Sequence, residues 1–441
     1  MDFEAAVYSK VTRRIIPFLF ACYILAYVDR VNIGFAKLQM QQDLGMSDTV
    51  YGIGAGIFFI GYFLFEVPAN IILQRVGARL WLGALMVVWG AVSSCTILAR
   101  GASSFYAIRM LLGIVESGFF PGVILYLTFW YTRKHRARMV ALFMCANPLS
   151  GVIAGPISGR IMAKMSGVGG LRAWQWLFLI EGIPSAIAGL VTMFYLVDGP
   201  AKAKWLSAEE RNHVERRLQE EEQVKQSEGP TRHRIVDAFR NGKVWLFCVI
   251  YFGFQMANYG LWFWLPQILN DTISTDPWII GLVSAIPWAA SAIAMIFYAH
   301  HSDKTGERRR HVALSAAVAG LAFAAGAVAW HSGTFAVFLV SLSAIGIMCG
   351  QSVFWSMPTA VLSGAAAAAG IAWINSVGNL AGYLSPFLVG HIRDRTGSMM
   401  LAQLVMAGSC MVAAAIAWAL KPSRPRQAAG QLPGLAADPE R

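Results

Sequence analysis

The chain of 441 residues is 56% hydrophobic and only 14% charged, whereas soluble domains carry roughly 25% charged residues. This composition argues against a soluble enzyme and indicates a polytopic membrane protein. The formal charge of +12 could suggest a nucleic-acid partner. Because the basic residues lie in loops between apolar stretches, we expect a lipid bilayer as the partner and no nucleic acid.

Twelve apolar stretches are long enough to cross a bilayer as helices, which takes about 20 residues each. They lie near residues 14–36, 50–73, 80–99, 104–131, 139–163, 174–197, 244–269, 278–299, 311–330, 334–362, 369–390 and 398–420. The predicted fold class is therefore an all-α polytopic membrane protein with twelve transmembrane helices in two pseudo-symmetric six-helix halves.

A polar stretch divides the twelve segments six and six. Within it, Ser207-Ala208-Glu209-Glu210 is a capping-box pattern, which predicts a charged amphipathic helix that runs through Glu222 along the cytoplasmic surface. The predicted regions are an N-terminal half (1–197), a central cytoplasmic loop (198–243), a C-terminal half (244–420) and a disordered cytoplasmic tail (421–441).

The distribution of basic residues predicts the orientation. With both termini in the cytoplasm, 27 of the 36 Lys and Arg residues fall on the inner side and 7 on the outer side, while Arg30 and Arg109 lie within spans. Arg75-Val76-Gly77-Ala78-Arg79 follows the second segment and Lys304-Thr305-Gly306-Glu307-Arg308 follows the eighth. These matching turns favour a repeat with a site between the halves, although short basic turns recur on any cytoplasmic face.

Four charged residues interrupt the apolar segments, namely Asp29 and Arg30 in the first and Arg109 and Glu116 in the fourth. A charge near the bilayer centre costs at least about 2.5–3.5 kcal/mol, so we expect these residues in a water-filled cavity or in pairs. At about 1.5 Å of rise per residue, Asp29 and Arg109 lie at a similar level in the outer third. Glu116 lies near the midplane.

These charges predict a site for an anion and for protons. An arginine stays charged and attracts an anion, whereas a carboxylic acid in a poorly solvated place can carry a proton. The simpler alternative is a salt bridge between Asp29 and Arg109 that only joins two helices. That alternative leaves Arg30 and Glu116 unexplained.

The second half carries no charge within its spans and offers neutral donors, acceptors and rings instead. They are Gln255, Asn258, Tyr259, Gln351, Ser352, Trp355, Ser356, Asn375 and Asn379. Such groups suit the hydroxyls or the far end of a substrate, and hydrogen bonding between helices is an even alternative for each one taken alone. We expect the first half to handle charge and protons, and the second half shape and hydroxyls.

The other titratable residues in or near the spans predict no further chemistry. We expect a structural role for Glu66 and leave the role of Glu181 open. The six cysteines have no close partner in sequence, so we interpret them as packing residues. Because His300, His301 and His311 lack ordered ligand spacing, we expect no metal. With no catalytic or nucleotide-binding motif either, we expect a protein that is not an enzyme, uses no cofactor and is driven by the proton gradient.

Several short motifs, weak singly but specific in this order, resemble the anion:cation symporter family of the major facilitator superfamily over nearly the whole chain. They are Tyr27-Val28-Asp29-Arg30-Val31-Asn32-Ile33-Gly34, Phe65-Glu66-Val67-Pro68-Ala69-Asn70, Arg75-Val76-Gly77-Ala78-Arg79, Arg109-Met110-Leu111-Leu112-Gly113, Glu116-Ser117-Gly118, Pro121-Gly122, Glu181-Gly182-Ile183-Pro184, Asp303-Lys304-Thr305-Gly306-Glu307-Arg308-Arg309 and Asn375-Ser376-Val377-Gly378-Asn379. The stretch from Tyr51 to Asn70 looks especially like bacterial carriers of tartrate and related hydroxy acids.

The resemblance implies a major facilitator fold and proton-coupled import of a small organic anion such as tartrate, a sugar acid or an aromatic acid. It implies that Asp29 and Glu116 are protonation sites and that Arg30 and Arg109 serve the carboxylate and the coupling. We assign substrate contacts to Arg30, Arg109, Tyr62, Gln255, Ser352, Trp355, Asn375 and Asn379, and gating or structural roles to Arg75, Arg79, Asp303 and Arg308.

One position departs from the superfamily's pattern. The loop between the second and third segments usually has an Asp before its basic residue, whereas this chain has Gln74 there and keeps Asp303 in the second-half copy. We therefore expect the first loop to gate differently from the usual one.

Two other functions compete with import. One is proton-coupled export of an amphipathic compound, and the other is a transporter-like sensor without flux, which would need a signalling extension larger than residues 421–441. We expect a monomer in the bacterial inner membrane.

Overall fold

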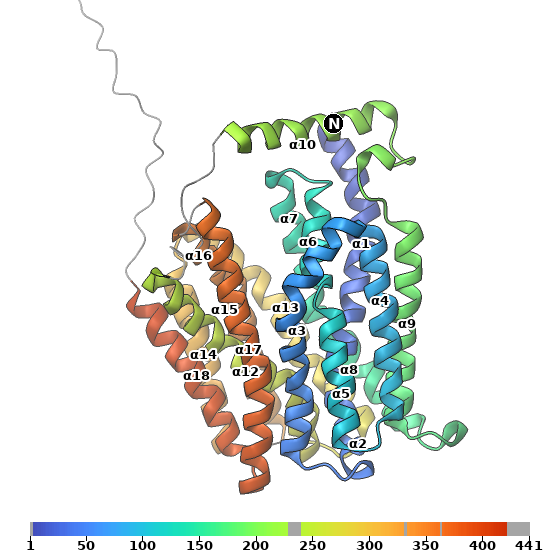
Figure 1. Cartoon of the computed structure of the whole chain (residues 1–441). Coiled ribbons are helices and arrows are strands. Elements are labelled where there is room, and N and C mark those ends of the chain that lie inside the picture. Colours follow the sequence, from blue (N-terminus) through green and yellow to red (C-terminus); the bar gives the residue numbers. More distant parts are fainter. Residues whose placement is uncertain (1–2, 228–239, 330–332, 362–363, 421–441) are drawn as a thin grey trace, which may run out of the picture.

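The computed structural model describes residues 3–227, 240–329, 333–361 and 364–420, and these residues are almost entirely helical (Figure 1). The helices before residue 198 are α1 (Phe3–Val31), α2 (Ile33–Asp43), α3 (Asp48–Val76), α4 (Ala78–Ser94), α5 (Ala102–Glu116), α6 (Phe119–Thr128), α7 (Arg133–Met144), α8 (Ala146–Lys164) and α9 (Ala173–Tyr195). Those after it are α10 (Ala208–Ser227), α12 (Gly242–Thr272), α13 (Pro277–Thr305), α14 (Arg309–Val328), α15 (Thr334–Phe354), α16 (Ser356–Val361), α17 (Gly364–Thr396) and α18 (Met400–Ala419). The predicted tail 421–441 lies outside the described residues.

Within these described ranges, eleven helical stretches are long and apolar enough to span a membrane. The predicted segment 369–390 falls in α17, which is 33 residues long but is not among the eleven. Its middle carries the polar residues Asn375 and Asn379, which lower its hydropathy. Because α17 packs along α3 and α12, it completes the bundle as the twelfth long helix.

Three predicted spans are each divided into two helices beside residues of the predicted site. The helix α1 ends one residue after Arg30, α5 ends at Glu116, and α15 ends just before Trp355. These breaks are kinks rather than loops, since Asn32 between α1 and α2 keeps helical angles of φ −54° and ψ −27°. Irregular backbone at membrane depth is tolerated where protein or a cavity surrounds it, so the kinks suit a buried site.

The two halves pack through α3 against α17 and through α8 against α13. Small residues allow these helices to approach closely. A Cβ atom added at Gly52 would lie 2.3 Å from the Pro386 carbonyl oxygen, and one at Gly155 would lie 2.7 Å from the Gly281 carbonyl oxygen. Gly52 and Gly155 therefore allow close contact between helices of the two halves.

The contact between the halves is concentrated at one end of the bundle. We name the end where α1 begins and α10 lies the terminal face, and the other end the opposite face (Figure 1). At its opposite-face end α3 is tightly packed, with Tyr51 and Phe58 fully buried. Toward the terminal face Leu64, Val67 and Ile71 are exposed. The hydrogen bonds that the first turn of α3 makes with the other half lie at the opposite face, from the Asp48 and Thr49 N–H groups to Asp394 and from Tyr51 OH to the Phe263 carbonyl at 3.0 Å, so the halves are joined there.

The helix α10 lies across the terminal face, where the sequence predicts a charged helix. The predicted capping box is present, because the Glu210 backbone N–H donates to Ser207 Oγ at 3.1 Å and the Ser207 N–H donates to Glu210 Oε2 at 2.7 Å. Lys10 of α1 also donates to Glu210 at 2.7 Å, and this hydrogen bond holds the pKa of the Glu210 carboxyl below its ordinary value. Local sequence signals therefore place this helix correctly.

Candidate functional site

The first pair of charged site residues joins α1 to α5. Arg30 Nε donates to Glu116 Oε1 at 3.0 Å, and a second guanidinium nitrogen forms an ion pair with the same oxygen. Arg30 is 9% exposed and Glu116 is 1% exposed. The second carboxylate oxygen, Glu116 Oε2, is buried without a hydrogen-bond partner among the described residues. The pair therefore keeps one acceptor unused.

Arg109 lies two helical turns before Glu116 on α5 and is 1% exposed. Its Nε, Nη1 and Nη2 atoms have no hydrogen-bond partner within the described ranges. Its guanidinium carbon lies 5.1 Å from the centre of the Phe58 ring, which gives a cation–π contact but no hydrogen bond. A buried guanidinium with unsatisfied donors is costly, so Arg109 is suited to hold a group that accepts hydrogen bonds and carries negative charge.

Asp29 points away from this pair, into the packing between α1, α4 and α9. Its Oδ1 accepts from Ser93 Oγ at 2.9 Å, and its Oδ2 accepts from Trp89 Nε1 at 3.2 Å and from Ser185 Oγ. Although Asp29 and Arg30 are adjacent on α1, their side chains therefore have different neighbours. The alternative of an Asp29–Arg109 salt bridge is wrong, because neutral donors surround Asp29.

Aromatic rings surround the Arg30 guanidinium. Its central carbon lies 5.0 Å from the ring centre of Tyr27, 5.2 Å from that of Phe58 and 5.5 Å from that of Tyr62. The predicted substrate contact Tyr62 therefore lies beside Arg30. Ring faces stabilise a cation that has left water, so the site can hold Arg30 charged while the partner of its guanidinium changes.

The C-terminal half adds a cluster of amides. Gln255 Oε1 on α12 accepts from Gln351 Nε2 of α15 at 2.7 Å and, more weakly, from Asn258 Nδ2 at 3.4 Å. One turn after Gln255, Tyr259 OH donates to Asn379 Oδ1 of α17 at 3.2 Å. Gln351 of α15 and Asn379 of α17 are therefore hydrogen-bonded to positions one turn apart on α12.

The remaining predicted contacts of this half are less tightly connected. Ser352 donates its hydroxyl to the Cys349 carbonyl of its own helix at 2.8 Å. Trp355 packs its ring 4.8 Å from the ring centre of Tyr251, and Asn375 lies one turn before Asn379 on α17. Because the Ser352 hydroxyl already donates to the backbone, Ser352 is a weaker candidate for a substrate contact than Gln255.

The predicted gating residues lie at the terminal face. Arg308 forms an ion pair with Asp303 at 2.5 Å, and the Arg79 backbone N–H donates to Asp198 Oδ1 at 3.0 Å. Neither contact joins the two halves, and Arg75 is exposed. The side chain of Gln74 lies outside the described residues.

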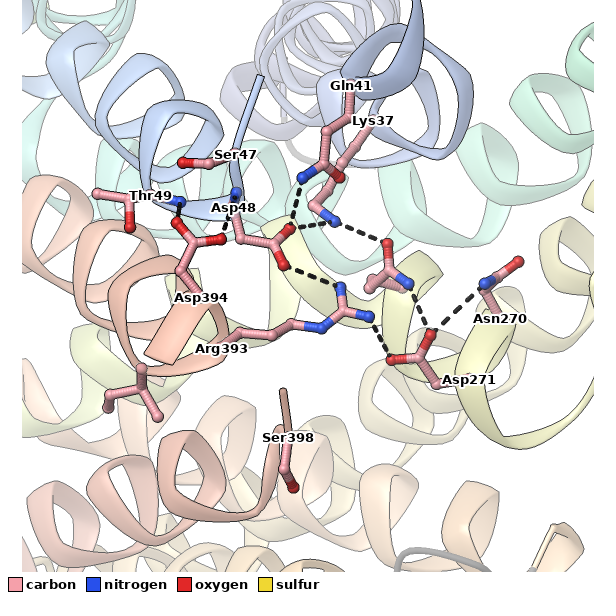
Figure 2. A network of polar contacts seen from close by, with 12 residues as sticks. Lys37, Gln41, Ser47, Asp48, Thr49, Asn270, Asp271, Arg393, Asp394 and Ser398 are labelled. Atoms are coloured by element: carbon pink, nitrogen blue, oxygen red, sulfur yellow. Dashed lines mark hydrogen bonds and ion pairs between the residues drawn. The ribbon is translucent and has the colours of Figure 1, made fainter. Parts of the chain in front are cut away.

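A charged network at the opposite face is missed by the sequence analysis, which treats its residues as loop charges. Lys37, Asp48, Asp271, Arg393 and Asp394 lie together there (Figure 2). Lys37 is only 1% exposed, although it counts as a solvated outer residue in the charge distribution. The available signal was the accumulation of charges at span ends of both halves on the same predicted side.

Glu181 is a further buried carboxyl between α8 and α9. It is 4% exposed, and its Oε1 accepts from Ser158 Oγ at 2.7 Å. Its Oε2 has no hydrogen-bond partner in the described part of the chain. With a single neutral donor, this group is held quite differently from Glu116.

Comparisons with known proteins agree with this architecture. A sequence profile described as Major Facilitator Superfamily matches residues 19–386. A protein of Agrobacterium vitis that is provisionally named a tartrate transporter is 48% identical over 426 residues, covering 96% of each chain. A quinolone resistance transporter of Acinetobacter baumannii is 39% identical over 402 residues, covering 90% of this chain and 91% of the relative.

A solved structure supports the same fold. The inward-open conformation of the xylose transporter XylE from E. coli matches with a TM-score of 0.74 and covers 96% of this chain and 98% of its own. Its sequence is only 14% identical, so the likeness concerns the arrangement of helices and not the substrate.

Proposed function

Because the chain belongs to the major facilitator superfamily, we propose that it is a proton-coupled symporter that imports a small organic anion by alternating access. The substrate class is a hydroxy-dicarboxylate such as tartrate, a sugar acid or an aromatic acid. The observation that carries this proposal is the buried Arg109, whose three guanidinium nitrogens have no partner within the described ranges.

Arg109 supplies the anion site. Its planar guanidinium presents parallel N–H donors that match a carboxylate. Because the site is removed from water, a carboxylate bound there gains more from the positive charge than it would in solution. Lysine at the same place would offer a point charge without this geometry.

Glu116 couples the anion to a proton. While Glu116 is ionised, it neutralises Arg30 through their ion pair. A proton on Glu116 removes the charge of the carboxylate and frees Arg30 to bind a second carboxylate of the substrate. Protonation therefore raises the positive charge that the site offers by one unit, which favours a dianion over a monoanion.

Asp29 is the second proposed proton site. In its ionised form it satisfies three donors, on Trp89, Ser93 and Ser185. Protonation would remove an acceptor and weaken the hold of α1 on α4 and α9. Because Arg30 is the next residue on α1, a shift of this helix would also move the substrate site.

The neutral half completes the substrate site. The amide oxygens and nitrogens around Gln255 and Asn379 suit substrate hydroxyls. The relative provisionally named a tartrate transporter is consistent with a substrate that combines carboxylates and hydroxyls. We propose that the protein works as a monomer, with the proton gradient as its driving force and no cofactor.

The positive-inside distribution assigns the terminal face to the cytoplasm. We propose that the protein lies in the bacterial inner membrane with both termini inside. In this orientation the halves, which are packed together at the opposite face, are in an inward-facing arrangement.

Export of an amphipathic compound is the second candidate, and the likeness to a quinolone resistance transporter favours it. Export would use the ring-lined surroundings of Arg30 for an aromatic substrate. It predicts drug resistance on expression and binding that does not need Arg109.

The experiment measures thermal stabilisation of the purified protein by a panel of organic acids, sugars and cationic amphiphiles at mildly acidic and at neutral pH. We expect stabilisation by one class of carboxylate, larger at acidic pH and lost in Arg109→Ala. Arg100→Ala, at an exposed position, is the matched control and should behave like the wild type. Stabilisation by cationic amphiphiles alone would replace the import proposal with export.

A further inference from the structure

At the opposite face, a ring of polar contacts joins the two halves (Figure 2). Lys37 on α2 is buried, and its Nζ lies 2.8 Å from Asp48 Oδ1 of α3. The same Nζ donates to Gln267 Oε1 of α12 at 2.7 Å. Because a buried ammonium has lost its hydration, it needs such partners. One of the two comes from each half.

Arg393 closes the ring from α17. Its Nη2 donates to Asp271 Oδ2 at 2.9 Å, and its Nη1 lies 3.6 Å from Asp48 Oδ2. Gln267 Nε2 donates to Asp271 Oδ1 at 2.7 Å, and because Gln267 also accepts from Lys37, it links Lys37 to the ion pair of Asp271 and Arg393. The ring thus contains two cations, two carboxylates and one amide, with two members from the N-terminal half and three from the C-terminal half.

Asp394, the next residue on α17, caps a helix of the other half. Its carboxylate oxygens accept from the backbone N–H groups of Asp48 at 2.9 Å and of Thr49 at 2.7 Å, the first two residues of α3. The local cap residue Ser47 accepts from the Val50 N–H at 3.2 Å. First-turn N–H groups have no partner inside a helix and favour negative charge, so the start of α3 is completed by α17.

The ring is built so that its opening leaves each cation with a carboxylate. The Lys37–Asp48 pair lies within the N-terminal half and the Arg393–Asp271 pair within the C-terminal half. Separation of the halves breaks the contact of Lys37 with the α12 amide, the contact between the two ion pairs, and both hydrogen bonds of Asp394. Because neither cation loses its ion pair, opening avoids the large penalty of an unpaired buried charge.

We propose that this ring is the gate that closes the opposite face during transport, and that Asp394 is a positioning residue that favours the closed gate by capping α3 from the other half. The inference rests on the proposed alternating access. The inference adds the residues that stabilise the inward-facing state. The residues assigned from sequence at the terminal face act on the other end of the molecule.

The test measures the distance between the halves at this face without any substrate. The six cysteines are first replaced by alanine. Spin labels are then attached at Gln42→Cys and Arg395→Cys, two exposed positions. Double electron–electron resonance in lipid nanodiscs gives the distribution of distances between the two labels. Asp394→Ala should raise the ratio of separated to closed molecules about fivefold, the size typical of a lost helix cap. Asp394→Asn should raise it less, since its amide oxygen still accepts one N–H.

Asp276→Ala is the matched control. Asp276 caps α13 at the same face, where its Oδ1 accepts from the Trp278 N–H at 2.9 Å, but donor and acceptor belong to the same half. This variant should leave the distance ratio unchanged. An unchanged ratio in Asp394→Ala, or an equal increase in Asp276→Ala, would overturn the proposal. If Asp394→Ala does not fold, Asp394→Asn carries the test.

The same variants separate this inference from the proposed substrate. Because the distance ratio needs neither substrate nor proton gradient, an incorrect substrate class leaves the result intact. In uptake experiments with the substrate identified by thermal stabilisation, Asp394→Ala should lower KM and kcat together, since a more open outer gate favours loading and slows closure. Loss of kcat at unchanged KM would instead indicate a merely structural role for Asp394.

Discussion

The N-terminal half gathers Arg30, Arg109 and Glu116 into a buried charged site, whereas the C-terminal half offers Gln255 and Asn379 in a network without charge. Both halves are built from long helices of similar length and composition. From this contrast we infer that the two halves differ in function through their side-chain chemistry and not through their architecture. We propose that the N-terminal half binds the charged groups of the substrate and the proton, and that the C-terminal half contributes shape and hydrogen bonds.

This division has a physical reason. Removing one partner of a buried ion pair is strongly destabilising. A pair that is to exchange a proton and an anion therefore avoids this cost if both of its residues lie in the same rigid half while the halves move. Arg30 and Glu116 meet this condition, since α1 and α5 both belong to the N-terminal half. The ring at the opposite face differs, because there the contact between Asp48 and Arg393 crosses the halves and must break.

The largest effect is expected from Arg109→Ala, which removes the anion site of the charged half. Truncating one side of a buried charged contact typically costs about 2–5 kcal/mol, so uptake should fall at least about thirtyfold and carboxylates should no longer stabilise the protein. Radiolabelled uptake into proteoliposomes measures this. Uptake at the wild-type rate, with Arg100→Ala as the reference, would remove Arg109 from the site.

The next largest effect is expected from Glu116→Gln, which keeps the shape of the side chain but cannot ionise. Proton-driven accumulation should fall about tenfold or more, the size of a typical coupling between two ligands, while counterflow exchange is partly retained. Wild-type uptake should rise as the external pH falls, because protonation of Glu116 frees Arg30, and the variant should lose this rise. Glu66→Gln is the control, and equal loss of both activities would refute a coupling role.

In the neutral half, Gln255→Ala should act on substrate affinity. It removes the oxygen that accepts from Gln351 and Asn258, and the loss of one buried hydrogen-bonding group costs about 1–3 kcal/mol. KM should therefore rise roughly five- to a hundredfold with a smaller change in kcat. Ser352→Ala should change little, because its hydroxyl already bonds to its own helix. A change in proton coupling on Gln255→Ala would break the division between the halves.

Much of the site could be predicted because a charge within an apolar span is conspicuous. This signal identifies Asp29, Arg30, Arg109 and Glu116 without a structure. Helical rise also gives an approximate depth for each. Depth does not give the direction around the helix or the reach of a long side chain, so the sequence could not decide that Arg30, and not Arg109, pairs with a carboxylate.

The opposite-face ring could not be predicted for a related reason. Lys37 and Arg393 lie at span ends, where a charged residue normally faces water. Only the packing of α2 and α3 against α12 and α17 buries Lys37 and brings Arg393 within reach of Asp48. In contrast, the capping box of Ser207 and Glu210 depends on contacts within four residues, and the sequence predicted it correctly.

The smallest effect is expected from Glu181→Gln, and it sharpens the comparison within the charged half itself. Glu116 faces an arginine, whereas Glu181 accepts from Ser158 and has an oxygen without a partner in the described part of the chain. A carboxylate held in this way would be a poorly compensated buried charge, so we infer that Glu181 is neutral, and glutamine reproduces a neutral acid closely.

Thermal unfolding should therefore shift by an amount equivalent to about 0.5 kcal/mol or less, and proton-driven uptake should persist. Ser158→Ala provides the reference for loss of the single hydrogen bond. If Glu181→Gln instead abolished accumulation while exchange continued, Glu181 would belong with Glu116 among the proton carriers. The charged half would then hold a third proton site, on α9, beside the two proposed at Asp29 and Glu116.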